Sequence, residues 1–487
     1  MALKIYNTLT RKKELLRPLE TGHVKLYVCG ITSYDYCHIG HARSALVFDM
    51  VVRYLRYRGY RVTFVRNFTD IDDKIINRAH EQGVDAASLA LRFINEFYTD
   101  MDALGTLRPD LEPKATEHVG EMIALIEELV AKGMAYPSGS DVYFRVERFA
   151  GYGQLSGRSL TDMQAGARVE VNEKKEHPMD FVLWKGAKPG EPKWSSPWGK
   201  GRPGWHIECS AMSKKYLGET FDIHGGGKDL VFPHHENEIA QSCGASGKPF
   251  ANIWMHHGFV TIKDEKMSKS LGNFLTIRDV LQQYNPEELR LFIFSTQYRN
   301  PLDFTEAALH DAQSGLERMY ECMARLATLP AGSANGTAIL SEKERQGLAQ
   351  IESRFCEAMD NDFNTAQALA HLFDAVKLIN KILGRLPDES IQEEMAQLQQ
   401  SGAMLRAVAG VLGLLQHDPL AVSAQRKEKI LAGIDLTETE IDNLIQRRNQ
   451  ARAEKNWAAS DEVRDTLLKH GVVLKDGPGG TTWEVKK

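Results

Sequence analysis

The sequence is poor in cysteine and contains no long hydrophobic run. Its six cysteines, at positions 29, 37, 209, 243, 322 and 356 of 487, are too few and too scattered for a disulfide framework. No apolar stretch approaches the roughly 20 residues that span a membrane, and the N-terminal residues lack the apolar core of a signal peptide. We therefore expect a cytoplasmic protein without a membrane segment, whose cysteines are thiols, metal ligands or core residues.

The chain also lacks a strong excess of either charge. Its net charge is -5, with 43% hydrophobic and 26% charged residues, which is typical of an ordinary globular protein. The length predicts more than one domain. Nucleic-acid binding would have to come from local patches, and residues 1–66 are a candidate because they hold twelve Lys/Arg against four acids. A solvated basic face explains that stretch equally well.

The first part of the chain reads as a strand, a helix and a second strand. Residues 25–30 form a buried apolar run that ends at a glycine, residues 38–59 carry apolar side chains at helical spacing, and residues 61–67 read as the next strand. This order predicts a parallel α/β sheet. The turn between the first strand and the helix is where such sheets bind nucleotides.

The remaining sequence predicts an interruption of this fold and then mostly helices. Helices are expected at 85–104 and 117–132, and residues 135–200 are richer in short strands, Gly, Pro and Trp. Loops or loose stretches are expected at 330–336 and 417–423. The end of the chain predicts a helix from Asn456 to Gly471, followed by a turn and a short strand.

His38-Ile39-Gly40-His41 stands at the predicted start of the first helix. A helix N-terminus favours phosphate, because its N–H groups are unpaired and carry partial positive charge. The two imidazoles can face one ligand from the same turn, and Gly40 lets a nucleotide approach the backbone. Alternatively, one histidine merely caps the helix.

A second motif, Lys266-Met267-Ser268-Lys269-Ser270, follows a strand predicted at 258–262. Its two ammonium groups suit the β- and γ-phosphates of a leaving pyrophosphate. Gly272 allows loop closure. On its own, a run with two lysines is more often solvated surface.

Scattered soft donors indicate a metal site. Cys29, Cys209, His234 and Glu238 together offer two thiolates, an imidazole and a carboxylate, a plausible tetrahedral set for Zn²⁺. His234 and Glu238 share a face if they lie on a helix, since they are four residues apart. No Cys-x-x-Cys pair announces the site, and other donors compete: His206, His224, His235, Cys37 and Cys243.

The two nucleotide motifs, in this order and more than 200 residues apart, resemble those of class I aminoacyl-tRNA synthetases. The donors between them narrow the resemblance to cysteinyl-tRNA synthetases, over essentially the whole chain. The resemblance implies an α/β, Rossmann-type parallel-sheet catalytic domain with an insertion, then an α-helical bundle and a small C-terminal α+β domain. The implied bounds are 1–315, with the insertion at about 110–200 and the lysine loop at 266–270, then 316–424 and 425–487.

The resemblance also assigns roles to residues. The implied zinc ligands are Cys29, Cys209, His234 and Glu238; the implied catalytic residues are His38, His41, Lys266 and Lys269, which with Gly40 also bind ATP. The implied substrate pocket consists of Gly30, Thr69, Trp205, His224 and Asp229. Alternatively, Trp205 is a core residue. The glycines at 225–227 alternatively form a tight turn with close packing.

The implied reaction activates L-cysteine with ATP and Mg²⁺, releases pyrophosphate, and transfers cysteine to the 3′ end of tRNA(Cys). The implied Zn²⁺, one per chain, binds the cysteine thiolate and so rejects serine, which shape alone separates poorly. A monomer is expected. Two rivals are a ligase that joins cysteine to an amino sugar and a non-catalytic tRNA-binding paralogue. Near the C-terminus, Trp457 and Trp483 are interpreted as core residues rather than as platforms for an anticodon base.

Overall fold

The computed structural model describes residues 2–159, 174–262, 265–266, 274–387, 390–431, 435–477 and 480–485. The chain forms two compact units. The first comprises residues 1–313, 356–369 and 411–413, and the second comprises residues 314–355, 370–410 and 414–487. Within the described part of the chain, no helix is both long and apolar enough to cross a bilayer.

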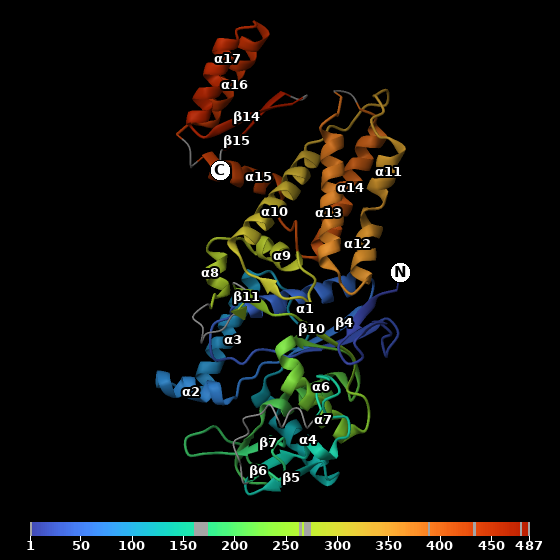
Figure 1. Ribbon diagram of the computed structural model, residues 1–487, viewed down its shortest axis with the longest axis vertical. Coiled ribbons are helices and arrows are strands. Elements are labelled where there is room, and N and C mark those ends of the chain that lie inside the picture. Colours follow the sequence, from blue (N-terminus) through green and yellow to red (C-terminus); the bar gives the residue numbers. More distant parts are fainter. Residues whose placement is uncertain are drawn as a thin grey trace. The chain divides into compact units, whose positions relative to one another are not determined.

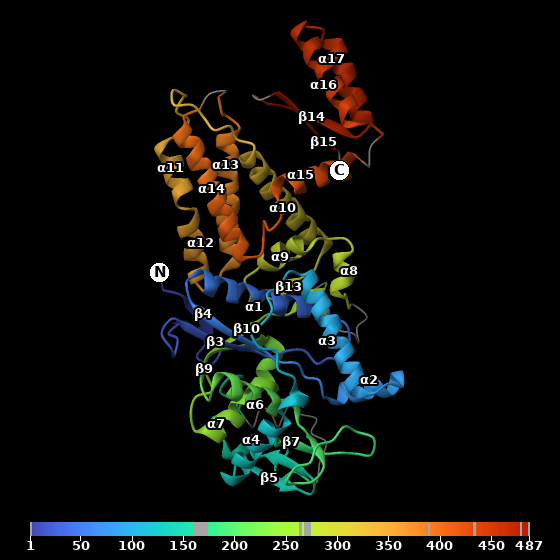
Figure 2. The same ribbon diagram turned by 180° about the vertical axis from the view of Figure 1, so that it is seen from behind.

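A four-stranded parallel sheet organises the first unit. Its order is β10–β9–β3–β4, formed by Ala251–His257, Phe221–Gly227, His23–Val28 and Arg61–Arg66. Helix α1 (Ile39–Tyr57) connects β3 to β4 and covers one face, whereas α6 (Trp205–Leu217) lies on the other face (Figures 1 and 2). The predicted strand–helix–strand unit and the α/β fold class are therefore confirmed.

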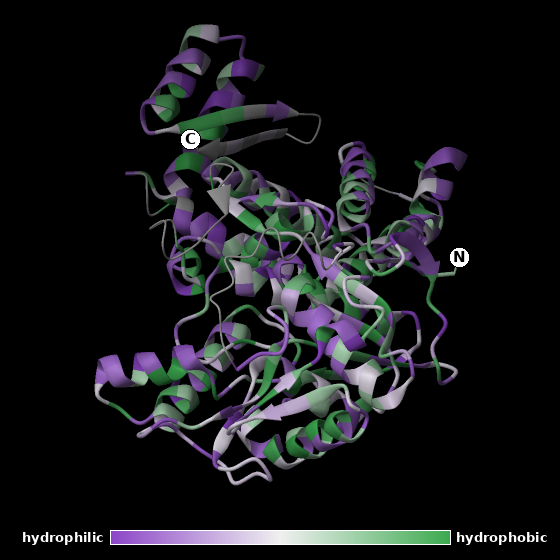
Figure 3. Ribbon diagram, turned by 60° about the horizontal axis from the view of Figure 1, so that its bottom comes forward, coloured by the Kyte–Doolittle hydropathy of each residue, from purple (hydrophilic) through white to green (hydrophobic). Residues whose placement is uncertain are grey.

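One large core cluster of this unit lies between the sheet and the helices on the face opposite α1, and most of α1 is itself buried on the other face. Leu125, Ile207, Ile239 and Trp254 are buried there together with Tyr27. Every residue of β9 is buried, as expected for a central strand of a parallel sheet. Along many helices the ribbon in Figure 3 changes between green and purple, so apolar and polar residues alternate along them.

The insertion between β4 and α6 contains a second, antiparallel sheet of order β5–β6–β7–β8. The predicted helices at 85–104 and 117–132 are observed as α3 and α4. The elements of the first unit not yet given are β1 (Lys4–Asn7), β2 (Lys12–Leu15), α2 (Asp73–Gln82), α3 (Ala86–Ala103), α4 (Val119–Ala131), β5 (Ala135–Ser138), β6 (Asp141–Phe144), β7 (Phe181–Gly186), β8 (Gly201–Pro203), α7 (Glu236–Ser246), β11 (Val260–Ile262), β12 (Glu265–Lys266), α8 (Ile277–Leu281), α9 (Pro286–Phe294) and β13 (Leu302–Asp303).

The second unit is mainly helical and ends in a small α+β element. Its elements are α10 (Glu306–Ala327), which begins in the first unit, α11 (Glu342–Ala349), α12 (Ile351–Asp360), α13 (Thr365–Leu383), α14 (Gln392–Val411), α15 (Pro419–Leu431), α16 (Glu438–Ala453), α17 (Trp457–Lys469), β14 (Val472–Gly477) and β15 (Gly480–Val485). The turn between α12 and α13 belongs to the first unit.

Two predictions about the second unit were wrong. The stretch 417–423 is not loose, because α15 begins at Pro419, where the Asp418 carboxylate accepts a hydrogen bond from the N–H of Ala421. This capping starts a helix that composition alone did not reveal. Trp457 is not a core residue, since 60% of it is exposed. Trp483, by contrast, packs against the buried cluster around Ile441 and Leu467, as predicted.

Candidate functional site

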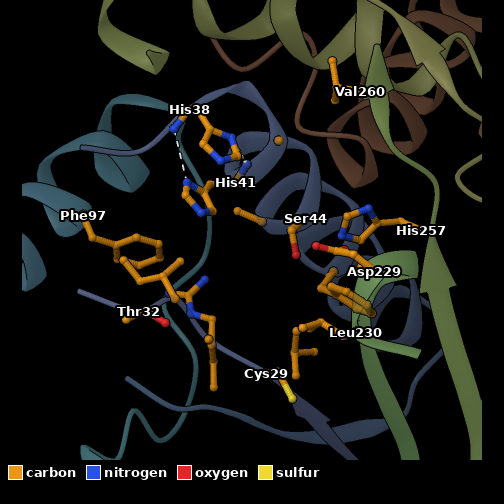
Figure 4. A pocket seen from close by; sticks show the side chains of 18 of the residues that line it. Cys29, Thr32, His38, His41, Ser44, Phe97, Asp229, Leu230, His257 and Val260 are labelled. Atoms are coloured by element: carbon orange, nitrogen blue, oxygen red, sulfur yellow. Dashed lines mark hydrogen bonds between the residues drawn. The ribbon is translucent and has the colours of Figure 1, made fainter. Parts of the chain in front are cut away.

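A cavity of about 600 Å³ opens where the carboxyl ends of β3 and β9 meet the start of α1. The connections leave this sheet in opposite directions from β3, toward β4 and toward β9, which is where α/β sheets bind ligands. Figure 4 shows His38 and His41 on one side of the cavity, Asp229 and His257 on another, and Cys29 with Leu230 at a third. The cavity is thus lined by residues from two distant parts of the sequence, 28–97 and 205–274.

His38 and His41 stand at the N-terminus of α1 and cap it together. The Nδ1 atom of His38 accepts a hydrogen bond from the N–H of His41 at 3.3 Å, and Nδ1 of His41 accepts one from the N–H of His38 at 3.2 Å (Figure 4). Their rings are stacked with centroids 3.8 Å apart. Both side chains nevertheless line the cavity, so capping and ligand contact are compatible.

Glycines let the ends of the strands close around the cavity. A Cβ atom on Gly30 would lie 1.5 Å from the carbonyl oxygen of Asn67, so no larger residue fits there. The N–H of Gly30 donates to Oδ1 of Asn67 at 2.9 Å. The glycines at 225–227 do not form the tight turn considered as an alternative; they end β9, and Gly225 packs against the ring of Phe48.

The second motif is only partly within the described residues. Lys266 belongs to β12, which pairs antiparallel with β11, whereas Lys269 and the rest of 267–273 lie outside the described part of the chain. From residue 274 on, the chain lies against the first motif. The N–H of Ile39 donates to the carbonyl of Leu275, and His38 pairs with Thr276. Residues 275 and 276, shortly after the second motif, therefore lie beside the first motif.

The scattered donors meet beside the cavity. Cys29, Cys209, His234 and Glu238 offer ligand atoms that all lie within 4.8 Å of one another. The two sulfurs are 3.6 Å apart, Cys29 Sγ is 3.4 Å from Glu238 Oε1, and His234 Nε2 is 3.0 Å from the same oxygen. Two sulfurs bound tetrahedrally to Zn²⁺ at roughly 2.3 Å each stand about 3.8 Å apart. The donor set therefore fits a Zn²⁺ ion in both spacing and chemistry.

A second donor set shares two of these residues. Cys29 and Glu238 also lie within the same distance of His224 and His235. His224 Nε2, however, is hydrogen-bonded to Glu238 Oε2 at 2.8 Å, and His235 Nδ1 to His256 at 2.8 Å. The contact of His224 is typical of a group that orients a metal ligand, whereas His235 keeps its other nitrogen, Nε2, 3.3 Å from Cys29 Sγ. The geometry alone leaves both sets available.

The electrostatics of the cluster favour the ligand forms of Cys209 and Glu238 only. Burial and the neighbouring Cys209 raise the pKa of Cys29 well above its usual value, and, against the opposing effect of burial, Glu238 and Cys209 raise the pKa of His234 to about 10. Burial opposes ionisation of Cys209, but the hydrogen bond from Cys29 and the nearby His234 outweigh it and lower the pKa of Cys209 to about 6. Burial likewise opposes the charged form of Glu238, yet His224 and His234 hold its pKa well below the usual value. A thiolate and a carboxylate are thus present at neutral pH without any metal contribution.

Some of the predicted pocket residues line the cavity, and others are buried behind its wall. Trp205 is 38% exposed, lines the cavity and stacks on His234 with ring centroids 4.2 Å apart, so its core interpretation is wrong. Asp229 also lines the cavity. Thr69 is buried and donates to Glu208 at 2.7 Å, and burial raises the pKa of Glu208 well above normal. His224 is fully buried and lies behind the cluster, stacked on Trp254.

Sequence reasoning missed a residue of the cavity wall and one that supports the wall. Asn67 positions Gly30, and its place directly after β4 was the available signal. Arg66 lines the cavity, pairs with Glu112 at 2.7 Å and lies over the ring of Phe97. Arg66 is buried and is therefore not part of a solvated basic face over residues 1–66.

Comparison with known proteins agrees with this arrangement. The family model of the class I (C) tRNA synthetase catalytic domain matches residues 15–314, that of the DALR domain matches 354–416, and that of the cysteinyl-tRNA ligase anticodon-binding domain matches 435–483. Among solved structures, methionyl-tRNA synthetase of Mycobacterium tuberculosis with methionyl-adenylate has a TM-score of 0.59 at 15% identity, covering 80% of this chain and 89% of its own. That likeness concerns the fold.

Curated relatives are much closer in sequence. A cysteine–tRNA ligase of Desulfotalea psychrophila is 65% identical, and one of Geobacter sulfurreducens is 55% identical, each covering 100% of both chains. With a family model over more than half of its length and such relatives, this chain belongs to the cysteinyl-tRNA synthetase family.

Proposed function

We propose that this protein is a cysteine–tRNA ligase. It activates L-cysteine with ATP to cysteinyl-adenylate and pyrophosphate, and then transfers cysteine to the 3′ end of tRNA(Cys), releasing AMP. The observation that carries the proposal is that Cys29 belongs both to the cavity wall and to the buried donor cluster, while His38 and His41 face the same cavity. One cavity thus offers an anion site and a sulfur-recognising site.

The nucleotide binds at the N-terminus of α1. The neutral rings of His38 and His41 accept backbone hydrogen bonds through Nδ1, so each carries its proton on Nε2 and can donate it to phosphate oxygens. Gly40 admits the nucleotide to the backbone. Lys266 and Lys269 supply positive charge to the leaving pyrophosphate, and Mg²⁺ accompanies ATP. Positioning and electrostatic stabilisation carry this step without a protein nucleophile.

The metal ligands are Cys29, Cys209, His234 and Glu238, with one Zn²⁺ per chain. These residues would hold the ion, which would supply a soft Lewis acid for the thiolate of cysteine, a ligand that serine cannot provide. His224 supports this set from behind, because its bond to Glu238 Oε2 turns Oε1 toward Cys29 and His234. The preference for this set over the one with His224 and His235 rests on that division of roles.

The amino-acid pocket lies between the cluster and the nucleotide site. Gly30, Thr69, Trp205, His224 and Asp229 shape it, with Gly30 and Trp205 on the cavity wall. Asp229 offers a carboxylate at this wall, which suits the ammonium group of the amino acid. The fixed hydrogen bond between Thr69 and Glu208 keeps the floor of the pocket rigid.

The tRNA is held by the remainder of the chain. In this proposal residues 1–315 form the catalytic domain with its insertion at about 110–200, residues 316–424 form a helical bundle on the tRNA-stem side, and residues 425–487 bind the anticodon. The protein acts as a monomer in the cytoplasm, where its substrates tRNA and ATP occur together.

The proposal is tested by attachment of cysteine to total tRNA with purified protein, ATP and Mg²⁺. Cysteine is charged and serine is not. Cys209→Ser loses one metal ligand, so both bound zinc and charging fall together, whereas Cys243→Ser, a half-buried thiol outside the donor set, retains both. Absence of charging by folded, zinc-loaded protein with its tRNA present contradicts the proposal and favours the amino-sugar ligase.

A further inference from the structure

Arg43 is a buried cation within the helix that carries the two histidines. It lies two residues after His41, is 0% exposed, and donates hydrogen bonds to three backbone carbonyls. The acceptors are Phe259 at 2.6 Å, Tyr298 at 3.1 Å and Asn300 at 2.5 Å. The guanidinium therefore joins α1 to two segments that are distant in sequence.

The partners that the described residues supply to Arg43 are neutral oxygens. Burial lowers the pKa of Arg43 to about 10, which still leaves it charged at neutral pH. A buried charge is tolerated only where strong hydrogen bonds replace its hydration, so these three bonds must persist for the charge to remain. Arg43 consequently fixes the backbone at Phe259, and both Phe259 and Val260 line the cavity just before β12 and Lys266.

The loop 297–300, which supplies two of those carbonyls, is held from its other side by Asp362. The carboxylate of Asp362 accepts hydrogen bonds from the Tyr298 hydroxyl at 2.8 Å and from Nε of Arg299 at 2.9 Å. It also accepts one from the N–H of Tyr6 at 2.8 Å. Asp362 is 1% exposed, and its bond to Tyr298 is buried, whereas Arg299 is 32% exposed. The loop is thus clamped by a buried cation and a buried anion that do not contact each other.

Asp362 adopts a backbone conformation that needs support. Its φ is +67° and that of Phe363 is +47°, in the left-handed region that disfavours residues other than glycine. Such conformations persist where surrounding contacts over-determine them, and they occur preferentially at functional sites. The two residues form the turn between α12 and α13, within the segment 356–369 of the first unit.

We propose that Arg43 and Asp362 are positioning residues for ATP, acting through the shared loop 297–300 to hold the Phe259–Val260 edge of the cavity in place. The inference rests on the proposed function, because it takes this edge as part of the nucleotide site. Neither residue touches the reacting atoms. Loss of either one releases the same loop, and ATP binding weakens while cysteine binding does not.

The test measures the ATP dissociation constant by calorimetry, without tRNA, and the KM values for ATP and cysteine in cysteine-dependent pyrophosphate exchange. Arg43→Lys and Asp362→Asn are each expected to weaken ATP binding on the order of tenfold, since each removes hydrogen bonds to a charged group. The KM for cysteine should change less than about twofold. The double variant should resemble the weaker-binding single variant, because both residues act through one loop.

Asp360→Asn is the matched control. Asp360 is equally buried, lies two residues away, and binds Tyr54 and Arg58 at the C-terminal end of α1 instead of the loop. It should leave ATP binding unchanged. Tyr298→Phe, which removes only one hydroxyl, provides the test should Arg43→Lys fail to fold, and it should weaken ATP binding several-fold.

Specific outcomes overturn the inference. Unchanged ATP affinity in the folded variants, equal losses for ATP and cysteine, or the same loss in Asp360→Asn each contradict it. Effects of the two single variants that multiply in the double variant contradict the shared loop. Failure of the proposed function looks different, because unaltered protein would then bind ATP yet support no cysteine-dependent exchange.

Discussion

His38 and His41 each accept a hydrogen bond from the backbone N–H of the other, which closes the N-terminus of α1 with two imidazoles in place of the usual hydroxyl or carboxylate. A ring that accepts through Nδ1 carries its proton on Nε2 when neutral. The capping contact therefore sets the tautomer that can donate to a phosphate. In the proposed function, the helix cap and the nucleotide site are one structure.

Replacing His38 separates these two roles. His38→Ala should lower the free energy of unfolding by about 1 kcal/mol through loss of the cap, and should also abolish most of the charging activity. His38→Asn restores a good capping group without the Nε2 donor, so stability should return while activity stays low. Thermal unfolding and pyrophosphate exchange measure the two effects. Recovery of activity in His38→Asn would show that capping is the only function of His38.

His224 should influence metal affinity without being a ligand. His224→Gln removes the bond that orients Glu238, and loss of such a partner typically weakens metal binding roughly 10–100-fold. The measurement is competition for Zn²⁺ with a chromophoric chelator. His118→Gln, a buried histidine bonded to Tyr216 and the carbonyl of Lys114, serves as the control and should leave zinc affinity unchanged. Complete loss of stoichiometric zinc in His224→Gln would instead favour the donor set with His224 and His235.

The two C-terminal tryptophans should respond oppositely to substitution. Trp457 is exposed, so Trp457→Ala should leave thermal unfolding unchanged but raise the KM for tRNA on the order of tenfold if the indole stacks on a base. Trp483 packs on the apolar cluster of α16 and α17, so Trp483→Ala should destabilise this element. An unchanged KM for tRNA in folded Trp457→Ala would exclude the stacking role.

Glu344 should make the helical unit sensitive to acid. Hydrogen bonds from Arg385 and Ser341 lower its pKa to about 2, below the value of about 4.3 for an unfolded chain. Its stabilising contribution is therefore fully present above the unfolded value and is lost as the pH falls toward 2. Hydrogen exchange of α11 and α13 should distinguish Glu344→Gln from the unaltered protein at pH 6, and roughly half as strongly at pH 3. The exposed Glu393→Gln should show no such difference at either pH.

Local features of the fold were predictable because their causes are local. The apolar run before Gly30 and the spacing along 38–59 depend on near neighbours in sequence, and β3 and α1 appear within a few residues of the predicted bounds. The final helix begins after the Asn456 cap, as predicted. Where local signals were weak, as at Pro419, the prediction failed.

Side-chain environments were less predictable, since burial depends on what packs from elsewhere. Arg43 and Arg66 counted as two of many basic residues, yet both are buried and bonded across long sequence separations. The acidic carboxylate of Asp362 could be read only as part of a helical region. Its contacts with Tyr6 and Tyr298 exist because three distant segments meet.

The sequence by itself determined the parallel α/β core, the identity of the motif that starts α1, and the chemical types of the metal donors, because these follow from residue identity and short-range periodicity. Only the tertiary structure decided that Cys29 and Cys209 lie 3.6 Å apart, that Glu238 is held by His224, and that Arg43 and Asp362 clamp one loop. Most of these contacts join residues that are far apart in the sequence; Cys29 and Cys209, for example, are 180 residues apart. These distances are fixed by tertiary packing, because the chain between two distant residues does not by itself determine how far apart they lie.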